Sequence, residues 1–373
     1  MTTVQEVPEL LRPAIEKYRD EAEALGRLPE ELVRELVAHG AFRLSTPRDF
    51  GGFEASTAEV LDVLSRVARI DGPTAWILWN MNLGFISGLL AESRAREVWA
   101  PGRDPLIAHS GKPGRLVAAD GGFTLSGRWQ IVSGAHLAER FLLAGVLTDP
   151  ADPGRDAGRY FCLVPRSSVT VLDTWDVVGM RSSDSNAVVA EEVFVPQDSI
   201  FSFSTPNRFA DRPAYRLPTV HLLYPGGAAV LIGMAQGAVD ELAALAKTKT
   251  TMSGGTLAAT EAVQDALGRA TVQVAAARGL LMAAVTELAS STEPTDEQRA
   301  ALRGSIAHVA ETARTVLTAM YTAGGSNPLY TPSRLGRIFR DGMAAAQSAN
   351  LSAAQFALRG RILLGEPAGV PFI

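Results

Sequence analysis

Apolar side chains recur every three or four residues through the first hundred positions, which is typical of amphipathic helices. The recurring positions are Leu10, Leu11, Ile15, Leu32, Leu36, Val37, Val60, Leu61, Val63, Leu64 and Val67. A proline and a glycine pair in residues 46–53 predict an irregular loop between two helices. The apolar run over 76–90 is too short to span a membrane and predicts a buried helix. We expect an N-terminal helical domain over residues 1–104.

The hydrophobic period changes to two between about Pro105 and Ser204, which indicates strands. Five such runs cover 123–126, 141–147, 160–164, 169–172 and 187–190. Turn residues separate them, and the connections are too short for crossover helices. We therefore expect a central antiparallel β domain over residues 105–208.

Alanine-rich segments with a helical period follow from about Tyr215. They cover 233–247, 260–290, 295–321 and 335–364. We expect a C-terminal four-helix bundle over residues 209–373, which makes the whole chain an α+β protein.

Composition narrows the classes of partner. The chain has 373 residues, 47% of them hydrophobic, and a formal net charge of −5. A negative charge argues against nucleic acid or an anionic membrane as the main partner, so small molecules or proteins are favoured. Cys162, the only cysteine, lies in an apolar run and predicts a buried structural thiol. The N-terminus has no basic stretch leading into an apolar core, and we expect a cytoplasmic protein.

Familiar catalytic motifs are missing from the sequence. We find no phosphate-binding glycine loop, no dinucleotide fingerprint and no nucleophile elbow. The five histidines lack the spacing of metal ligands, so no metal site is predicted. Of these histidines, His109 and His136 are the stronger candidates for chemistry.

Four segments, taken together and in order, resemble the acyl-CoA dehydrogenase superfamily. They are Pro-Arg-Asp-Phe-Gly-Gly at 47–52, Gly-Arg-Trp-Gln-Ile-Val-Ser-Gly at 127–134, the stretch 173–185 with the strand end 193–196, and Leu-Gly-Arg-Ile-Phe-Arg-Asp at 335–341. The resemblance covers essentially the whole chain. It implies a helical domain, a β domain, a C-terminal four-helix bundle and a homotetramer that holds flavin between subunits.

The region around Asp341 separates two branches of that superfamily. Acyl-CoA dehydrogenation needs a carboxylate to remove a weakly acidic proton. The usual family position, eight residues after the aspartate, is Ala349, and the alternative position at 224–228 has no carboxylate either. The chain therefore better resembles the monooxygenases that receive reduced FMN or FAD from a separate reductase and use O2 to hydroxylate aromatic rings, thiophenes or amines. This resemblance implies that the protein hydroxylates or oxidises a small metabolite. A dehydrogenase or oxidase with a non-standard base and a catalytically silent binding subunit stay as alternatives.

One family feature is absent. Many of those monooxygenases carry a histidine directly after the glutamine that corresponds to Gln347, and this chain has Ser348. A serine cannot act as a base near neutral pH without a partner. Three possibilities remain: a substrate that is already nucleophilic, a base supplied by His109 or His136, or different flavin chemistry.

The resemblance also implies flavin-binding residues. Ser133 matches the hydroxyl residue beside flavin N5, where it would stabilise the oxygen-bearing flavin, and Trp129 would wall the ring. We expect both on one strand and on the same side of it, since they are four residues apart. Ser182, Ser183 and Ser185 could supply backbone N–H groups to the pyrimidine ring or a phosphate, with an ordinary polar loop as the alternative.

Further residues are predicted at the phosphate end of the flavin and around the substrate. Gly324 and Gly325 permit close backbone approach, and the family uses this turn near the cofactor of a neighbouring subunit. Arg337, Arg340 and Lys249 could pair with phosphate, with salt bridges or a solvated helix end as the alternatives. In the family this apolar helix lines the substrate cavity, so the resemblance implies Trp79, Asn80, Asn82 and Phe85 as substrate contacts, with a buried core as the alternative.

Overall fold

The computed structural model describes residues 2–100, 104–149, 152–202, 204–217, 219–252, 254–291 and 293–369. Contacts between residues divide the chain into two units. The first, called the sheet unit, comprises Met1–Ser56, Ile77–Asp176 and Arg181–Leu222. The second, called the bundle unit, comprises Thr57–Trp76, Val177–Met180 and Leu223–Ile373. The domain boundaries at 104 and 208 stay predictions.

Helix α1 (Val7–Leu25) illustrates how the N-terminal helices form. Pro8 lies in the first turn, where its missing N–H costs no hydrogen bond. Leu11 and Ile15 are four residues apart on one face, and both are fully buried. Gly26 ends the helix with φ 69°, and α2 (Glu30–Ala38) follows. The other helical elements of the sheet unit are α5 (Glu92–Val98), η1 (Val4–Glu6), η2 (Arg48–Phe50), η3 (Gly84–Gly88), η4 (Arg166–Ser168), η5 (Arg181–Ser183), η6 (Gln197–Ser199) and η7 (Pro213–Tyr215).

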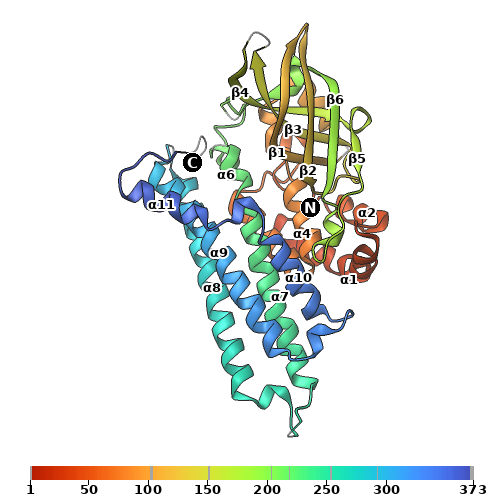
Figure 1. Cartoon of the computed structure of the whole chain (residues 1–373), viewed down its shortest axis with the longest axis vertical. Helices are drawn as coiled ribbons and strands as arrows, with labels where there is room; N and C mark the ends of the chain where they lie inside the picture. Colours follow the sequence, from red (N-terminus) through yellow and green to blue (C-terminus); the bar gives the residue numbers. More distant parts are fainter. Residues whose placement is uncertain are drawn as a thin grey trace. The chain divides into compact units, whose positions relative to one another are not determined.

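The described residues of the sheet unit form one seven-stranded sheet in the order β5-β6-β2-β1-β3-β4-β7 (Figure 1). Its strands are β1 (Ile107–Ala119), β2 (Gly122–Val132), β3 (Arg140–Asp149), β4 (Asp152–Pro165), β5 (Thr170–Leu172), β6 (Asn186–Pro196) and β7 (Ile200–Phe201). Leu116, Leu125 and Phe141 are fully buried along it. Turn residues at 149–154, which were expected to separate two strand runs, fall partly on residues outside those described.

The sheet is mixed, so the prediction of a purely antiparallel domain is wrong for one strand pair. β1 and β3 run parallel, with Ile107 opposite Arg140. The chain reaches β3 from β2, which lies on the other side of β1. Residues 133–139 cross the start of β1, where the main-chain N–H groups of Glu139 and Arg140 donate to the Leu106 carbonyl. A short connection that skips one strand therefore produces a parallel pair without a crossover helix.

Strand β1 was not predicted because glycine and proline interrupt its sequence over 111–114. The structure has a register shift between Ser110 and Gly114 at this point. Gly114 and Gly127 leave room for the Trp129 ring, since a Cβ on either would lie within 3.0 Å of it. Trp129 itself is fully buried, and its indole N–H donates to the Ala144 carbonyl at 3.0 Å.

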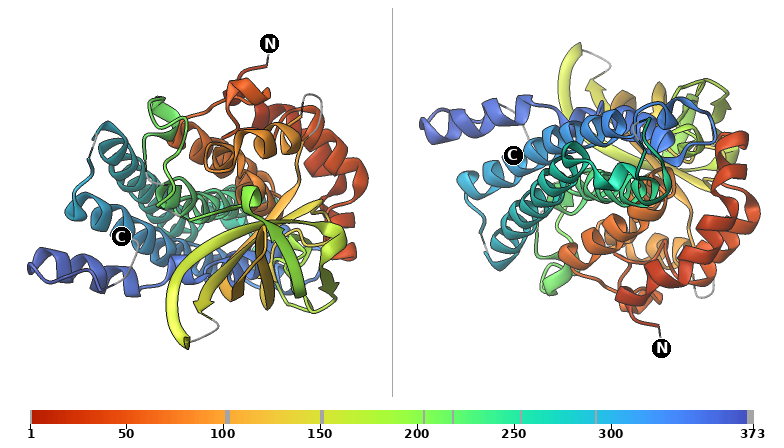
Figure 2. Two further views of the ribbon diagram at one scale, coloured as in Figure 1. Left: turned by 90° about the horizontal axis from the view of Figure 1, so that it is seen from above. Right: turned by 90° about the horizontal axis from the view of Figure 1, so that it is seen from below.

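The bundle unit contains long helices that lie side by side (Figures 1 and 2). These are α7 (Gly226–Thr248), α8 (Glu261–Ser290) and α9 (Asp296–Ala323), with α10 (Arg334–Ala345) packed on α7 and α9, and α11 (Ala354–Leu363) on α9. α3 (Thr57–Ile70) packs on α7. The short turns η8 (Leu257–Ala259), η9 (Asn327–Leu329) and η10 (Ala349–Leu351) join the helices, while α4 (Gly72–Met81) and α6 (Thr219–Leu223) each cross a boundary between the units.

Two predicted helices are shorter than expected. The helix expected to continue to residue 90 ends at Met81, and the Asn82 side chain just beyond it donates to the Leu78 carbonyl at 2.8 Å. Gly84 then packs so closely on Thr46 that a Cβ would lie 2.1 Å from its hydroxyl. The helix expected over 335–364 breaks into α10 and α11, and the Arg314 guanidinium donates to the Ala346 carbonyl at the break.

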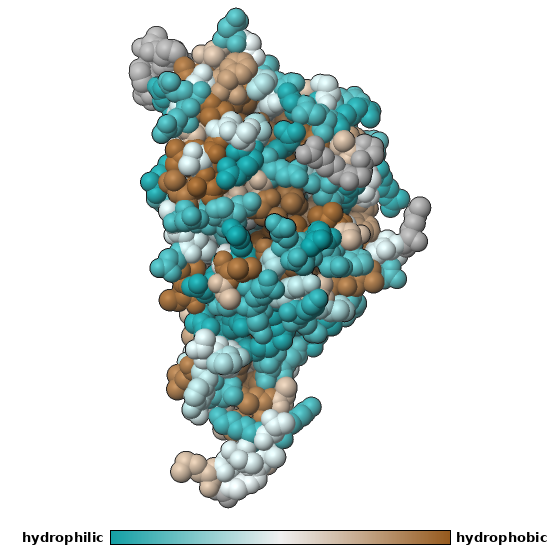
Figure 3. Space-filling view, turned by 90° about the vertical axis from the view of Figure 1, so that its right-hand side faces the viewer, coloured by the Kyte–Doolittle hydropathy of each residue, from teal (hydrophilic) through white to brown (hydrophobic). Residues whose placement is uncertain are grey.

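Two long helices and the exposed surface show where apolar residues lie in the described part of the chain. Within the described part of the chain, 221–248 and 261–290 are long and apolar enough to cross a membrane, as core helices of water-soluble proteins also are. In the face drawn in Figure 3, apolar side chains lie in patches among polar ones. Exposed large apolar residues include Ile131, Val178 and Phe194.

Candidate active site

Two loops of the sheet unit meet at the ends of β2 and β6. The main-chain N–H of Gly134 donates to the Ser183 carbonyl at 2.9 Å, and that of Ala135 donates to the Asp184 carbonyl at 3.1 Å. The backbone of Ile131 and of Asp184 is left-handed, with φ of 59° and 50°, a conformation that residues other than glycine rarely adopt. Such backbone persists where the surrounding structure holds it, and it is concentrated at functional sites.

The left-handed Ile131 corrects one expectation. Trp129 and Ser133 were predicted to face the same side of one strand, but the register shifts between Trp129 and Val132, and β2 ends at Val132. The extra residue of this bulge breaks the alternation of side chains. Trp129 therefore lies in the packed interior of the sheet unit, while Ser133 belongs to the loop that follows β2.

Three of the predicted serines come together. The Ser185 hydroxyl lies 2.9 Å from the Ser133 hydroxyl and 2.7 Å from the Ser183 hydroxyl, so the three form a hydrogen-bonded chain. Each is at least nine-tenths buried. Ser182 is also buried, in the adjoining turn η5. Hydroxyl groups both donate and accept, so this cluster can match a ligand edge that carries both kinds of polar atom.

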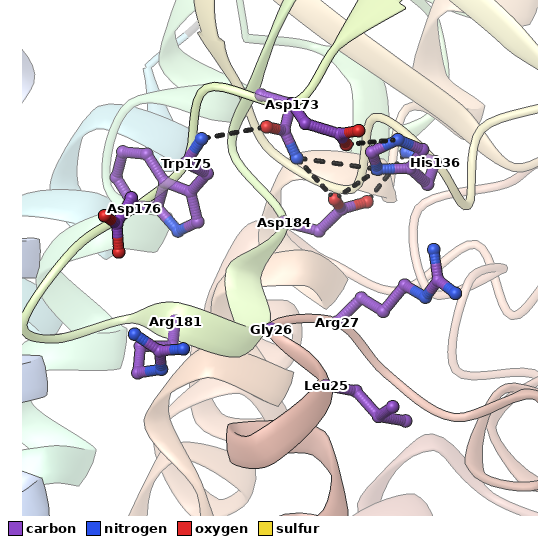
Figure 4. Close-up of a pocket in the computed structure, with 10 residues that line it drawn as sticks. Leu25, Gly26, Arg27, His136, Asp173, Trp175, Asp176, Arg181 and Asp184 are labelled. Carbon is purple, nitrogen blue, oxygen red and sulfur yellow. Dashed lines mark hydrogen bonds and ion pairs between the residues drawn. The ribbon is translucent and has the colours of Figure 1, made fainter.

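His136 is held by Asp184 next to this cluster (Figure 4). The Asp184 carboxylate accepts from the main-chain N–H of His136 at 2.7 Å, and its other oxygen lies 2.7 Å from the ring nitrogen Nδ1. The Asn186 amide also donates to Asp184, at 2.8 Å. Asp184 is 2% exposed, so these contacts supply the hydrogen bonds that a buried carboxylate needs.

The other ring nitrogen of His136, Nε2, lies 3.2 Å from the Asp173 carboxylate. The Asp173 side chain is 93% exposed. Its backbone neighbours are fixed, since the main-chain N–H groups of Thr174 and Trp175 both donate to the Asn186 side-chain oxygen. Asn186 therefore orients both the Asp184 carboxylate and the strand segment that carries Asp173.

His136 and Asp184 line two hollows of the sheet unit. The smaller, of about 250 Å³, is lined by Leu25, Gly26, Arg27, His136, Asp173, Trp175, Asp176, Arg181, Asp184 and Asn186 (Figure 4). The larger, of about 610 Å³, extends along α1 and α2 and shares Leu25, Arg27, His136 and Asp184 with the first. The turn at Gly26 is joined to the 181–186 loop, where the Arg181 guanidinium donates to the Glu23 carbonyl at 3.3 Å.

His109 and Ser348, the other predicted catalytic residues, lie elsewhere. His109 is on β1, and its Nδ1 is 3.0 Å from the Asn80 carbonyl, so Nδ1 carries the proton. Burial lowers the pKa of His109, and the Asn80 carbonyl opposes this in part. Ser348 is partly buried in the bundle unit and precedes the turn η10 instead of lying within a helix.

Three of the residues predicted near the flavin phosphates lie together in the bundle unit. The Lys249 ammonium donates to the Gly324 carbonyl at 2.8 Å, and Gly325 has φ 63°, where an added Cβ would lie 3.2 Å from the Lys249 ammonium. Arg337 and Arg340 lie on α10, both partly buried. These residue roles stay predictions, as do those of the serines and histidines.

Asp341, which follows these arginines, makes a contact inside the bundle unit that the sequence did not reveal. It is 2% exposed, and its carboxylate accepts from the main-chain N–H of Met180 at 2.6 Å. Met180 has φ 57°. Gly179 packs against α10, since a Cβ there would lie 2.3 Å from the Arg340 carbonyl. Asp341 thus fixes the segment that leads into residues 181–186.

The predicted substrate residues are mostly interior. Trp79 and Phe85 are buried, and the Asn82 side chain bonds main-chain groups of Ala41, Leu44 and Leu78 at 2.8 Å each. Asn80 is partly buried and offers its carbonyl to His109. Within the described ranges, no cluster of three or more histidine, cysteine or carboxylate residues could hold a metal ion.

Sequence reasoning missed Asp184, Asp173 and Asn186. All three lie in or beside a segment that carried the family resemblance, but their partners are up to 50 residues away in sequence. The one local signal was Asp184 between small polar residues, a setting in which aspartate tolerates left-handed backbone.

Comparisons with known proteins identify the family. Residues 2–94 match the acyl-CoA dehydrogenase N-terminal domain, and residues 226–353 match the acyl-CoA dehydrogenase C-terminal domain. Together these segments span more than half of the chain. The chain belongs to the acyl-CoA dehydrogenase superfamily. The resemblance noted in four sequence segments is thereby confirmed.

Characterised members of the superfamily with similar sequences are flavin-dependent monooxygenases. The oxygenase subunit HsaA of the flavin-dependent monooxygenase from Rhodococcus jostii is 31% identical over 244 residues, which is 62% of this chain and 62% of that protein. Indole-3-acetate monooxygenase from Pseudomonas putida is 26% identical over 372 residues, covering 95% of this chain and 94% of the relative. The matched part spans less than two thirds of HsaA but nearly all of the second protein.

Solved structures confirm the acyl-CoA dehydrogenase-like fold. XiaF from Streptomyces, solved with FADH2 and glycerol, has a TM-score of 0.93 at 24% identity and covers 99% of this chain and 97% of its own. FMN-bound TdsC from Paenibacillus has a TM-score of 0.83 at 19% identity and covers 98% and 99%. At these identities the likeness concerns the fold, and it agrees with the predicted α+β class.

Proposed function

We propose that this superfamily member is the oxygenase component of a two-component flavin-dependent monooxygenase. It would use reduced FMN or FAD and O2 to hydroxylate or oxidise a small metabolite. The observation that carries the proposal is the buried serine chain of Ser133, Ser183 and Ser185, which lies beside a histidine, in a chain that has Ala349 where a dehydrogenase would hold its carboxylate. Relatives that match in sequence are monooxygenases.

The serine chain fits the polar edge of a flavin ring. That edge presents both acceptor and donor atoms, which hydroxyl groups can satisfy in either direction. Ser133 would bond the ring at N5, while Ser182, Ser183 and Ser185 would support it. Bound reduced flavin supplies the two electrons that split O2, so that one oxygen atom enters the substrate and the other leaves as water.

The bundle-unit residues support a second contact with the cofactor. Lys249, Gly324 and Gly325 form a turn with a cation beside a backbone that permits close approach. Arg337 and Arg340 add fixed positive charge. We propose that these groups bind the phosphates of a flavin held by another copy of the chain, which would be a homotetramer. A separate reductase would supply the reduced flavin, and the reaction would take place in the cytoplasm.

The test measures flavin affinity under anaerobic conditions. Reduced FMN and reduced FAD should each be titrated into the protein. The reduced flavin with the higher affinity should bind more tightly than the oxidised form of the same flavin. Ser185→Ala removes the central hydroxyl of the chain and should weaken binding about tenfold, the effect of one hydrogen bond. Ser168→Ala is the control, because its exposed hydroxyl bonds only the nearby Pro165 carbonyl among the contacts described. Equal affinity in both variants would contradict the placement of the flavin edge.

A different outcome would favour another function. A chain that retains oxidised FAD through purification and is reduced by an organic substrate would be a dehydrogenase or oxidase. A chain that binds neither form of flavin would be a binding subunit.

A further inference from the structure

We propose that His136 is the acid–base residue of this enzyme, and that it takes the proton from the hydroxyl group of a single-ring aromatic substrate bound in the smaller hollow. This inference rests on the proposed function. It assigns to His136 the role of the base that position 348 lacks. His136 lies in the loop 133–139, three residues after Ser133.

Asp184 fixes which nitrogen of His136 can accept a proton. An ionised carboxylate accepts hydrogen bonds only, so Nδ1, at 2.7 Å from it, carries the hydrogen. In the neutral ring, Nε2 is then the acceptor. The main-chain N–H of His136 and the Asn186 amide hold Asp184 in place, and the left-handed backbone of Asp184 directs the carboxylate to the ring. This is how a carboxylate orients a histidine base.

Asp173 stabilises the other protonation state. Its carboxylate lies 3.2 Å from Nε2, a contact that is favourable only when Nε2 carries a proton. Because the Asp173 side chain is 93% exposed, the pair is screened by water and contributes little stability, so a ligand can displace it. Neutral His136 would therefore bond a substrate hydroxyl through Nε2, and protonated His136 would keep the contact with Asp173 that the structure has.

The proton transfer is balanced without a further reactant. The O–H bond of the substrate breaks, its electron pair stays on oxygen, and an Nε2–H bond forms on His136. Nothing is oxidised or reduced in this step. The product is an aromatic oxyanion, whose ring is richer in electrons and more readily hydroxylated.

The hollow suits a ligand of this kind. Its volume of about 250 Å³ lies just below the range of pockets for drug-sized ligands, which points to one ring. Trp175 and Leu25 provide apolar surface. In Figure 4, Arg27 extends on the side of His136, and Arg181 lies on the side of Asp176.

Carboxylates outnumber arginines around the two hollows. The groups that line the smaller one are Arg27, Arg181, His136, Asp173, Asp176 and Asp184, and the larger hollow adds Glu21, Glu30, Glu31 and Arg34. Such a surface disfavours a ligand that arrives as an anion. A neutral hydroxyl compound that hands its proton to His136 leaves a compensated pair, which the two arginines can accommodate.

The experiment uses 4-nitrophenol as the probe, because its oxyanion absorbs where the neutral form does not. The probe is added to the full-length protein, without flavin and with saturating oxidised FMN, at a pH where the free probe is mostly protonated. The wild-type protein should bind it as the oxyanion. His136→Asn keeps a side-chain N–H for Asp184 but has no base, and it should lower the bound oxyanion signal at least about tenfold.

Two further variants separate a base from a structural residue. His39→Asn, at the end of α2, is the matched control and should leave the signal unchanged. Asp184→Asn should lower the bound oxyanion signal while reduced-flavin affinity stays unchanged, because the ring loses the carboxylate that holds the hydrogen on Nδ1 and leaves Nε2 as the acceptor. Thermal unfolding of each variant confirms that it is folded.

Several results would overturn the proposal. They are an unchanged oxyanion signal in folded His136→Asn, an unchanged oxyanion signal in folded Asp184→Asn, or binding of the probe by wild-type protein only in its neutral form. Reduced-flavin affinity measured on the same samples keeps the two proposals apart. If His136→Asn binds reduced flavin normally and loses only the oxyanion signal, both stand. If wild-type protein gives the oxyanion but binds no flavin, the proposed function fails alone.

Discussion

Replacement of Asp341 by alanine should destabilise the bundle unit without disturbing its surface. The Asp341 carboxylate is 2% exposed and accepts from the Met180 main-chain N–H at 2.6 Å. Met180 is 3% exposed, so water cannot readily replace the lost acceptor. A hydrogen bond to a charged group contributes about 1.5–3 kcal/mol, and we expect a loss of about 2–3 kcal/mol in the free energy of unfolding.

Urea unfolding followed by circular dichroism measures this loss. With a slope of about 3 kcal/mol per molar urea, the midpoint should fall by roughly 0.5–1 M. Hydrogen exchange gives the local result, because the Met180 amide should lose protection in Asp341→Ala. Asp341→Asn keeps an acceptor oxygen and should lose about 1 kcal/mol.

The control is Asp265→Ala, which removes an exposed partner of Arg269 on α8 and should leave the midpoint unchanged. A midpoint in Asp341→Ala equal to that of this control, with the Met180 amide still protected, would refute the assignment of Asp341 as the anchor of residues 177–180.

Three further predictions concern the sheet unit. Burial lowers the pKa of His109 below the ordinary value of 6.5, so the unfolded chain binds this proton more readily than the folded chain. The free energy of unfolding should therefore fall as pH drops below 6.5. His109→Asn should reduce that fall, which urea midpoints measured across pH would show. Burial raises the pKa of the Cys162 thiol to about 12, so a thiol reagent should label it near neutral pH only after unfolding, and rapid labelling of native protein would contradict this. Gly114→Ala places a Cβ 2.6 Å from the Trp129 ring and should lower stability by about 1–3 kcal/mol, whereas Gly111→Ala on the same strand meets no atom within 4 Å and should not.

The sequence predicted those parts of the fold whose pattern is local. Alanine-rich helical periods identified α7, α8 and α9 to within a few residues, except that α7 begins seven residues earlier than the predicted 233. Alternating apolar residues located most strands. β1 was not predicted because Gly111, Pro113 and Gly114 interrupt its apolar pattern. Its parallel pairing with β3 could not be predicted either, because it depends on where the chain crosses β1.

The candidate site shows the same division. The serines at 133, 183 and 185 could be proposed from a family resemblance, since they lie in motifs that are read along the chain. The environment of His136 could not, because its partners Asp173 and Asp184 are 37 and 48 positions away and meet it only when two loops pair across the ends of β2 and β6. No local pattern encodes that meeting, which is a property of the sheet order.

The most direct test of the central claim follows the reaction of the protein with reduced flavin and O2. Reduced FMN or FAD, supplied without a reductase, is mixed rapidly with the protein and oxygenated buffer, and the absorbance spectrum is recorded over time. A monooxygenase component should delay the return to oxidised flavin and give a transient band that belongs to neither the reduced nor the oxidised form. Oxidation at the rate of free flavin, with no transient band at saturating protein, would contradict the account.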